Sequence, residues 1–197
     1  MHVILWTIIG FLSGSMPFSY WLGRLFLHID IRLYGDGNPG AFNAWRAGKY
    51  RVGLPALILD YLKGAIPVGI AKYVFGVSGF ELMPVALSPI LGHAFSPFLR
   101  FRGGKAVAST FGIWTGLTLW EGPTVLGISL ELSFLLQKVD AWSVIIGMMG
   151  LLIYLVLRQY DSSILIIWAA NMLILIWKHR KDLRQGIQPK SYFRRKS

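Results

Sequence analysis

Long apolar segments follow one another along the whole chain, and this pattern limits what the chain can fold into. Of its 197 residues, 54% are hydrophobic and only 15% are charged, whereas soluble domains carry about 25% charged residues. Backbone groups that enter lipid must pair within the protein, so apolar segments of this length fold as helices. We therefore predict an all-α fold, a polytopic membrane helix bundle, with one integral-membrane domain over residues 1–197.

Several of the apolar segments are shorter than the roughly 20 residues that a full membrane crossing needs. We expect about seven transmembrane segments, within a range of five to seven. Segments 83–98 and 122–136 are expected to be half-helices or tilted pieces inside the bundle, and Pro84, Pro89 and Pro97 fit an interruption of the first. The candidate segments are residues 3–26, 52–73, 83–98, 105–119, 122–136, 142–157 and 164–177.

The basic residues indicate how the chain is oriented. Loops 24–51, 99–105 and 137–141, together with the tail 178–197, hold 17 of the 20 Lys and Arg residues. Basic loops stay in the cytoplasm, so we predict that the N-terminus lies outside and the C-terminus in the cytoplasm, in the inner (cell) membrane. The net charge of +11 has the same origin, and we therefore do not expect nucleic acid as a partner.

A polar, glycine-rich segment at 34–46 lies between two apolar segments, and it is the first candidate binding site. Its glycines allow positive φ and let backbone amides approach a ligand, while successive N–H groups form an anion-binding nest. An arginine adds a fork suited to phosphate. An ordinary surface turn would use the same residue types. The candidate phosphate-binding residues here are Gly35, Asp36, Gly37, Asn38, Gly40 and Arg46, with Asn43 beside them.

A second glycine-rich segment, Phe101-Arg-Gly-Gly-Lys105, opens directly into an apolar segment. Helix N-termini present unpaired amides and a positive dipole, so Gly103, Gly104 and Lys105 are candidates to bind a phosphate. Lys105 could equally be an interfacial anchor. The segment lacks the spacer of a nucleotide-binding P-loop. Because both glycine-rich segments fall on the predicted cytoplasmic side, we expect a phosphate-bearing substrate to meet the bilayer there.

A few polar side chains lie in or near the apolar segments. Asp60 and Lys63 share a helix face at a spacing of three residues, and charges at membrane depth usually pair or line a cavity. We expect a structural ion pair, with support of a nearby site as the alternative. His93 and His179 flank the predicted cytoplasmic segments, where either could act as a general base or a phosphate ligand.

Several catalytic signatures are missing from the sequence. It contains no His/Cys or Asp-rich metal cluster, no D-x-x-D-G-x-x-A-R motif of the CDP-alcohol phosphotransferases and no G-x-S-x-G nucleophile elbow. The acyltransferase pattern H-x-x-x-x-D fails as well, because Phe98 stands five residues after His93. The absence of cysteine excludes thiolate chemistry. We therefore expect a site with no metal and no cofactor, built from loops, glycines and a few cations.

In order and content, these segments resemble the bacterial integral-membrane glycerol-3-phosphate acyltransferases that use acyl phosphate, the PlsY type. The resemblance covers nearly the whole chain and rests on three motifs. The first comprises Gly14-Ser-Met-Pro-Phe18, Asp30-Ile-Arg32, Gly35-Asp-Gly-Asn-Pro-Gly-Ala-Phe-Asn43 and Leu59-Asp-Tyr-Leu-Lys-Gly64. The second comprises Leu91-Gly-His93 with Phe101-Arg-Gly-Gly-Lys-Ala-Val-Ala108, and the third is Lys178-His-Arg180.

The chain departs from the family pattern near these motifs. Asp36 stands where the family usually has Ser, Phe42 where it has Thr, and Asp182 where it has Asn. The tail also lacks the usual Leu-Leu-x-Gly-x-Glu pattern. A carboxylate repels a phosphate unless a cation neutralises it, so we expect Arg32 or Arg46 to pair with Asp36.

The resemblance implies a reaction in which an acyl group passes from acyl phosphate to sn-glycerol 3-phosphate. The products are 1-acylglycerol 3-phosphate (lysophosphatidic acid) and inorganic phosphate, in the first step of phospholipid synthesis. The implied site faces the cytoplasm, in contact with membrane lipids, and we expect a monomer. His179 and Asn43 would orient the glycerol hydroxyl as catalytic residues. The supporting residues would be Ser15, Asp60, Lys63, His93, Lys178 and Arg180.

Two alternatives stay open from the sequence. A non-catalytic lipid or anion transporter could use the same loops as a gate, although transporters often contain two similar halves and no internal repeat is evident here. A homologue with altered acyl-acceptor activity is the other alternative, because Asp36 and Phe42 replace family-typical residues.

Overall fold

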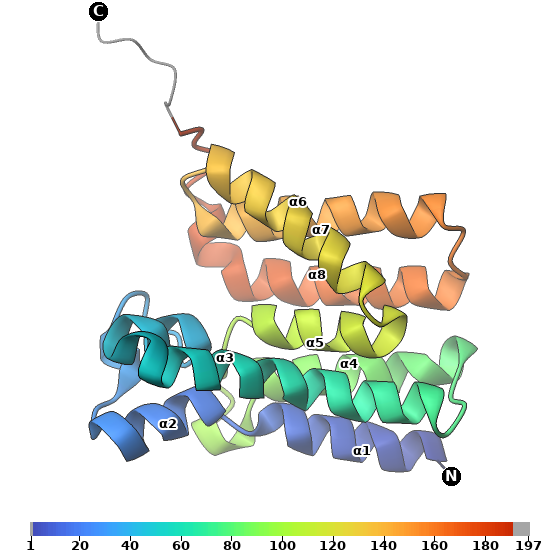
Figure 1. Ribbon diagram of the computed structural model, residues 1–197, viewed down its shortest axis with the longest axis horizontal. Coiled ribbons are helices and arrows are strands. Elements are labelled where there is room, and N and C mark those ends of the chain that lie inside the picture. The colour runs from blue at the N-terminus through green and yellow to red at the C-terminus, as the bar shows by residue number, and fades with distance from the viewer. Residues whose placement is uncertain (1, 191–197) are drawn as a thin grey trace, which may run out of the picture.

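A computed structural model describes residues 2–190, and its helices run mostly side by side along one direction (Figure 1). Short 3₁₀ turns cover Ile31–Leu33, Gly79–Glu81 and Pro97–Leu99. The all-α prediction is confirmed. The α-helices are α1 (His2–Ser15), α2 (Phe18–Leu27), α3 (Ala41–Tyr73), α4 (Leu82–Ala94), α5 (Val107–Thr118), α6 (Glu121–Leu136), α7 (Asp140–Leu157) and α8 (Ser162–Leu183).

Five stretches of residues 2–190 are long and apolar enough to cross a membrane, which is the lower end of the predicted range. The expectation of a half-helix at 83–98 is not supported, because α4 and its flanking 3₁₀ turns form a 21-residue candidate span. The stretches are His2–Leu27, Ala41–Tyr73, Gly79–Leu99, Asp140–Leu157 and Ser162–Leu183. Helices α5 and α6, with 12 and 16 residues, are shorter.

Both of the first two candidate spans contain a break. The first break falls inside the segment predicted as one continuous span, and the second falls inside the predicted loop 24–51. The segment 3–26 breaks after α1, because Pro17 lacks an N–H and cannot continue a helix, and it precedes the first residue of α2. The loop predicted at 24–51 is partly helical, since α3 begins at Ala41 and carries Arg46 on its first turns. Lys49 interrupts α3 with a φ of 50° and a ψ of −145°, and so separates a short leading piece from the long span.

Helices α3 and α5 pack against each other more closely than ordinary side chains allow. A Cβ at Gly112 of α5 would collide with the carbonyl oxygen of Tyr61 on α3, and a Cβ at Gly64 would lie 2.8 Å from the carbonyl oxygen of Ser109. Small residues at such crossings let two helix backbones meet, which is a common way to pack helices in membranes. This contact places α5 in the centre of the bundle, between α3 and the α6–α8 group (Figure 1).

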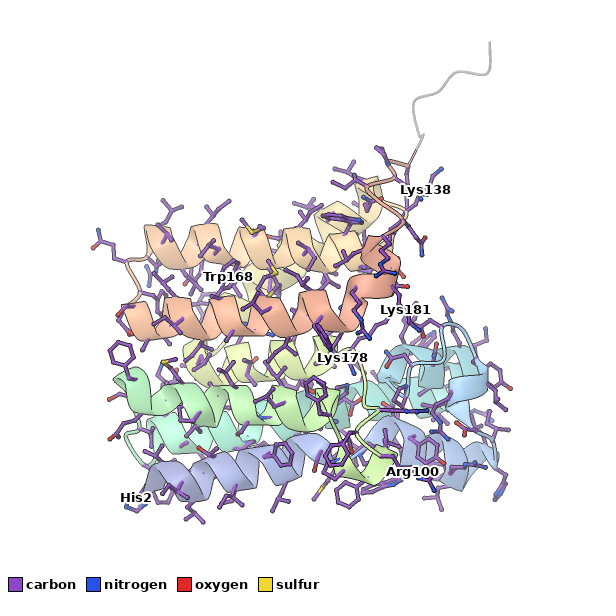
Figure 2. All side chains as sticks on the ribbon, turned by 180° about the vertical axis from the view of Figure 1, so that it is seen from behind. His2, Arg100, Lys138, Trp168, Lys178 and Lys181 are labelled. Carbon is purple, nitrogen blue, oxygen red and sulfur yellow. The ribbon has the colours of Figure 1, made fainter. Side chains whose placement is uncertain are left out.

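The basic residues gather at one end of the bundle. Figure 2 shows Arg100, Lys138 and Lys181 at the end opposite to His2. This is also the end where the loop before α3, the loop before α5 and the last turn of α8 lie (Figure 1). Residues 191–197, which were counted with the basic tail, lie outside the described residues.

We predict that Gly112→Ala destabilises the protein by about 1–3 kcal/mol, because the added methyl group has to push α3 and α5 apart. The measurement is the midpoint of thermal unfolding in detergent. Gly127→Ala on α6 is the matched control, since its Cβ would meet only Phe111 Cε1 at an ordinary 3.6 Å. Equal midpoints for the two variants would show that the crossing can relax.

Candidate active site

Three segments that are far apart in the sequence meet around Lys105, at the basic end of the bundle. Lys105 Nζ lies 2.5 Å from Asp36 Oδ2 and 2.5 Å from Asp182 Oδ2. Asp36 belongs to the loop before α3, and Asp182 to the last turn of α8. We name Asp36, Lys105 and Asp182 the Lys105 bridge. It joins the two glycine-rich segments, which the sequence had marked as one site, to the end of α8.

Asp36 is held by a second set of contacts through its other carboxylate oxygen. Oδ1 accepts hydrogen bonds from the backbone N–H of Asn38 at 3.1 Å and from Nδ2 of Asn43 at 2.9 Å. Asn43 also donates to the carbonyl of Asn38 at 2.9 Å. The loop is therefore closed on itself by side chains that the sequence had assigned to phosphate binding or catalysis.

The prediction that Arg32 or Arg46 neutralises Asp36 is wrong, because Lys105 is its cationic partner. Arg32 pairs instead with Asp30 at 2.6 Å. The guanidinium of Arg46 lies over the ring of Phe42, 4.8 Å from its centre. The Arg46 side chain nevertheless lies against the glycine-rich loop. Its Nη1 is so close to Gly35 that a Cβ at Gly35 would collide with it.

The charges of the Lys105 bridge reinforce one another. Burial alone would raise the pKa of Asp36, but the hydrogen bond and charge of Lys105, with the amide of Asn38, outweigh it and hold that pKa below its usual range. Burial would lower the pKa of Lys105, whereas hydrogen bonds and charge from Asp182 and Asp36 raise it above its usual range. Lys105 therefore remains an ammonium ion at neutral pH.

The glycines of the first segment have different roles. Gly35 and Gly37 have φ values of 58° and 75°, as the prediction of positive φ requires. The prediction of positive φ is wrong for Gly40, whose φ is −96°. Gly40 instead precedes the first turn of α3, where its carbonyl accepts from the amides of Asn43 and Ala44 at 3.1 and 3.2 Å.

The second glycine-rich segment is held by His93 and Lys178. The Gly104 amide donates to the His93 carbonyl at 3.0 Å, so it is not open to a phosphate as the sequence suggested. A Cβ at Gly104 would collide with the imidazole of His93. Lys178 Nζ donates to the carbonyls of Ala94 and Gly103 at 2.8 and 2.9 Å. These contacts fix the loop just before α5, and Lys105 lies two residues before the first residue of that helix, Val107.

Helix α8 contributes His179 beside the bridge. His179 and Asp182 lie on one face, since residues three apart are neighbours on a helix. His179 is buried, its Nδ1 lies 2.9 Å from the carbonyl oxygen of Leu175, and the charges of Lys105, Asp182 and Asp36 act on it. The contact at Nδ1 leaves Nε2 as the ring nitrogen available to a ligand.

Arg180 is not part of this cluster. It is exposed, its Nη1 donates to the carbonyl of Trp177 at 2.7 Å, and its guanidinium lies 4.8 Å from the centre of the Trp177 ring. Both of these contacts are with Trp177 and neither is with the Lys105 bridge, so the structure gives no support for the predicted supporting role of Arg180. Of its two neighbours in the motif, Lys178 donates to the loop before α5, and His179 lies close enough to the bridge for the bridge charges to act on it.

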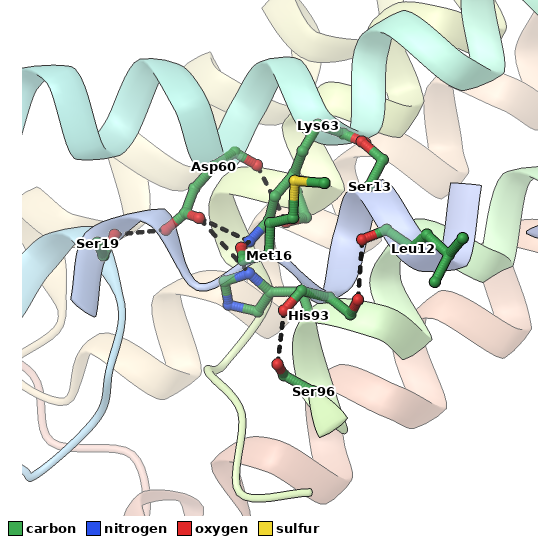
Figure 3. A network of polar contacts seen from close by, with 10 residues as sticks. Leu12, Ser13, Met16, Ser19, Asp60, Lys63, His93 and Ser96 are labelled. Carbon is green, nitrogen blue, oxygen red and sulfur yellow. Dashed lines mark hydrogen bonds and ion pairs between the residues drawn. The ribbon is translucent and has the colours of Figure 1, made fainter. Parts of the chain in front are cut away.

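A buried polar network lies beneath the loops (Figure 3). Lys63 Nζ and Asp60 Oδ1 are 2.6 Å apart, with both side chains 2% exposed, so the predicted ion pair is confirmed. Ser19 of α2 donates to Asp60 Oδ2 at 2.6 Å, and Ser109 of α5 donates to the Asp60 carbonyl at 3.0 Å. His93 Nδ1 is 3.9 Å from Asp60 Oδ1, beyond hydrogen-bond distance.

The same network closes the break between α1 and α2. Lys63 Nζ donates to the Met16 carbonyl at 2.9 Å, and Ser13 Oγ donates to the Lys63 carbonyl at 2.9 Å. Ser96 Oγ donates to the carbonyl of Ser15 at 2.5 Å, and Figure 3 shows how these groups converge. Ser15 therefore supports the site through its backbone, and the carbonyls of Ser15 and Met16 at the break are both paired.

The sequence had missed two kinds of residue. Asp182 was noted only as a departure from the family pattern, although its spacing of three residues from His179 placed it on the same helix face. The hydroxyls of Ser19, Ser96 and Ser109 gave no signal, because serine is common in apolar segments and its partner lies elsewhere in the chain.

We predict that Lys63→Met destabilises the protein by about 3–5 kcal/mol, because it leaves the buried carboxylate of Asp60 without its cation. The double variant Asp60→Asn/Lys63→Met should be more stable than Lys63→Met alone. Thermal unfolding in detergent is measured for Asp60→Asn, for Lys63→Met and for the double variant. Arg32→Met is the control, since that exposed pair is worth about 0–1 kcal/mol. A double variant that loses the sum of the two single losses would show that the charges act independently.

The sequence matches the model of the family described as glycerol-3-phosphate acyltransferase over residues 4–188. Glycerol-3-phosphate acyltransferase 1 of Thermotoga maritima is 42% identical over 194 residues, which cover 91% of this chain and 95% of that protein. Glycerol-3-phosphate acyltransferase of Endomicrobium trichonymphae is 32% identical over 185 residues, which cover 94% of this chain and 92% of that protein.

The fold is similar to that of PlsY (YgiH), an integral membrane glycerol 3-phosphate acyltransferase. Its glycerol 3-phosphate form superposes with a TM-score of 0.86 and 27% identity, over 93% of this chain and 90% of that one. Its lysophosphatidic acid form gives a TM-score of 0.84 and 26% identity, over the same shares of 93% and 90%. The sequence and fold comparisons thus agree with each other along most of the chain.

Proposed function

The chain belongs to the glycerol-3-phosphate acyltransferase family and has the fold of its PlsY type, and on that premise we propose that it transfers an acyl group from acyl phosphate to sn-glycerol 3-phosphate. The products are lysophosphatidic acid and inorganic phosphate. The observation that carries the proposal is the position of Lys105, where both glycine-rich segments and the His179 face of α8 meet.

The chemistry asks for positioning more than for a reactive side chain. The glycerol hydroxyl oxygen attacks the carbonyl carbon of the acyl phosphate, and the bond from that carbon to the phosphate oxygen breaks. The hydroxyl proton leaves with a base, which is His179 or the departing phosphate. The mixed anhydride is already activated, so bringing two anions together in the right orientation supplies most of the rate enhancement.

The residues of the site divide this task. Lys105, the N–H groups at the start of α5 and the loop around Gly35 and Gly37 would bind phosphate. Arg46 lies against the same loop and would add its guanidinium. His179 Nε2 would orient the glycerol hydroxyl or accept its proton. Asn43 would act chiefly by holding the loop, since its amide already donates to Asp36 and Asn38.

The proposal includes a location. We place the site at the cytoplasmic face of the inner membrane, with the acyl chain between the helices and the phosphates at the loops. The gathering of basic residues at the same end of the bundle supports this orientation (Figure 2). A single chain supplies all the side chains named above, which supports a monomer.

The test uses purified protein in nanodiscs with glycerol 3-phosphate and, in parallel, acyl phosphate or acyl-CoA. Lysophosphatidic acid is followed by mass spectrometry and phosphate by release assay. We expect equal amounts of both products from acyl phosphate and none from acyl-CoA. Product from acyl-CoA alone would keep the acyltransferase and reject the donor. Binding of glycerol 3-phosphate without product from either donor would indicate a homologue with altered activity.

We predict that Lys105→Ala lowers kcat/KM by at least about tenfold, because a charge-assisted phosphate contact is worth about 1.5–3 kcal/mol. Arg180→Ala is the matched control, since it removes an exposed cation that is turned towards Trp177. We expect Arg180→Ala to keep near-normal turnover. Full activity in a well-folded Lys105→Ala variant would reduce Lys105 to an interfacial anchor.

We predict that the loop after α3 lies outside and the end of α8 lies in the cytoplasm. The chain contains no cysteine, so single cysteines report their side without background. Ser78→Cys and Gln185→Cys, both at exposed positions, are treated with a membrane-impermeant maleimide on spheroplasts. Ser78→Cys should be labelled at once and Gln185→Cys only after permeabilisation. The reverse pattern would contradict the orientation.

A further inference from the structure

Asp182 is held in a place where a carboxylate is not otherwise favoured. It lies in the last turn of α8, at the negative end of the helix dipole. Among residues 2–190, its side chain has one hydrogen-bond partner, Lys105 Nζ at 2.5 Å. The attraction of Lys105 is therefore what keeps the Asp182 carboxylate in position.

Asp36 differs from Asp182 although both contact the same ammonium group. Besides Lys105, Asp36 accepts from the Asn38 amide and from Asn43 through its other oxygen. If Lys105 were engaged elsewhere, Asp36 would still be held in its loop. Asp182 would lose its partner and could swing into solvent. Of the two carboxylates, Asp182 is the one that can leave.

The charges around Lys105 explain why an arriving phosphate favours the release of one carboxylate. The ammonium group of Lys105 faces two carboxylates, those of Asp36 and Asp182. The three side chains together carry a net negative charge, which repels a phosphate at close range. The side chains of Asp36 and Asp182 are 40% and 29% exposed, and that of Lys105 is 23% exposed. Solvent therefore reaches both carboxylates, and the additional hydrogen bonds of Asp36 are what distinguish it from Asp182.

We propose that Asp182 is a displaceable counter-ion of Lys105. In the protein without substrate, its carboxylate occupies the position on Lys105 that a substrate phosphate takes, and phosphate binding releases it. The inference rests on the proposed function only in treating Lys105 as a phosphate ligand. The competition sets the affinity for a phosphate monoester or acyl phosphate and leaves the acyl-transfer step unchanged, so Asp182 acts as an affinity-setting residue.

The test is Asp182→Asn, which removes the charge and keeps the shape. We expect the KM of one phosphate substrate, or the inhibition constant of inorganic phosphate, to fall by about threefold to tenfold, with kcat changed by less than about twofold. Varying glycerol 3-phosphate and acyl phosphate separately shows which phosphate competes with Asp182. Asp182→Ser is measured alongside, so that the result does not depend on one variant folding.

The control is Asp140→Asn, which removes an equal charge from the exposed first turn of α7. We expect no change in KM, since Asp140 has no ion pair with Lys105. A fall in KM as large as that of Asp182→Asn would assign the effect to net charge and overturn the inference. So would an unchanged or raised KM, or a loss of kcat, in both Asp182 variants.

Binding measurements separate this inference from the proposed function. Titration calorimetry with glycerol 3-phosphate and with inorganic phosphate needs no acyl donor. Tighter binding to Asp182→Asn than to the unchanged protein, in a preparation that transfers no acyl group from any donor, would support the counter-ion role and reject the proposed reaction. Acyl transfer by the unchanged protein with equal phosphate binding in all variants would do the reverse.

Discussion

The buried ion pair between Asp60 and Lys63 is the interaction on which the other elements depend. Pro17 separates α1 from α2 within the first candidate span, and a carbonyl freed at membrane depth must find a donor. Lys63 is that donor, for Met16. A single unpaired charge is costly in this environment. The break therefore needs Lys63 as a donor, and Lys63 in turn needs Asp60 as its counter-ion. The break allows α2 to leave the line of α1, and through Ser19 the carboxylate of Asp60 holds α2 in place.

The candidate site is built from helix ends and loops rather than from helix faces. The glycine loop precedes α3, Lys105 precedes α5, and His179 lies near the end of α8. Each end brings unpaired backbone groups and a partial charge that a helix interior lacks. Lys178 ties two of these ends together, because it donates to the loop before α5 from α8. The cations and amides are thereby fixed before any ligand arrives, which lowers the reorganisation that binding requires.

Much of the fold and part of the site could be predicted from local pattern, and the failures have a common cause. Apolar segments predicted the helices, but the break at Pro17 lies inside a segment whose overall polarity gave no boundary. The helical piece that begins at Ala41 was missed because it overlaps the polar, glycine-rich segment 34–46, although the predicted start of the span at residue 52 lies close to the break at Lys49. Lys105 was expected at the site because glycines precede it. The partner of Asp36 was predicted wrongly, since Arg32 and Arg46 are near in sequence whereas Lys105 arrives only through the packing of α5 on α3. Local sequence reports what a residue can do, and tertiary packing decides which neighbour it meets.

The length of α8 ties the depth of the site to the thickness of the bilayer. Its 22 residues extend about 33 Å, while the hydrocarbon core of a membrane is about 30 Å thick. His179 therefore lies near the lipid–water boundary, with little helix to spare beyond it. A thicker membrane draws such a helix upright or thins locally around it, and a thinner one tilts it. Because Lys178 ties α8 to the loop before α5, the loop and the histidine move together, and their geometry is kept while their immersion changes. Under the proposed function, the acyl-chain length of the surrounding lipids thus sets how far a water-soluble phosphate must descend to reach Lys105.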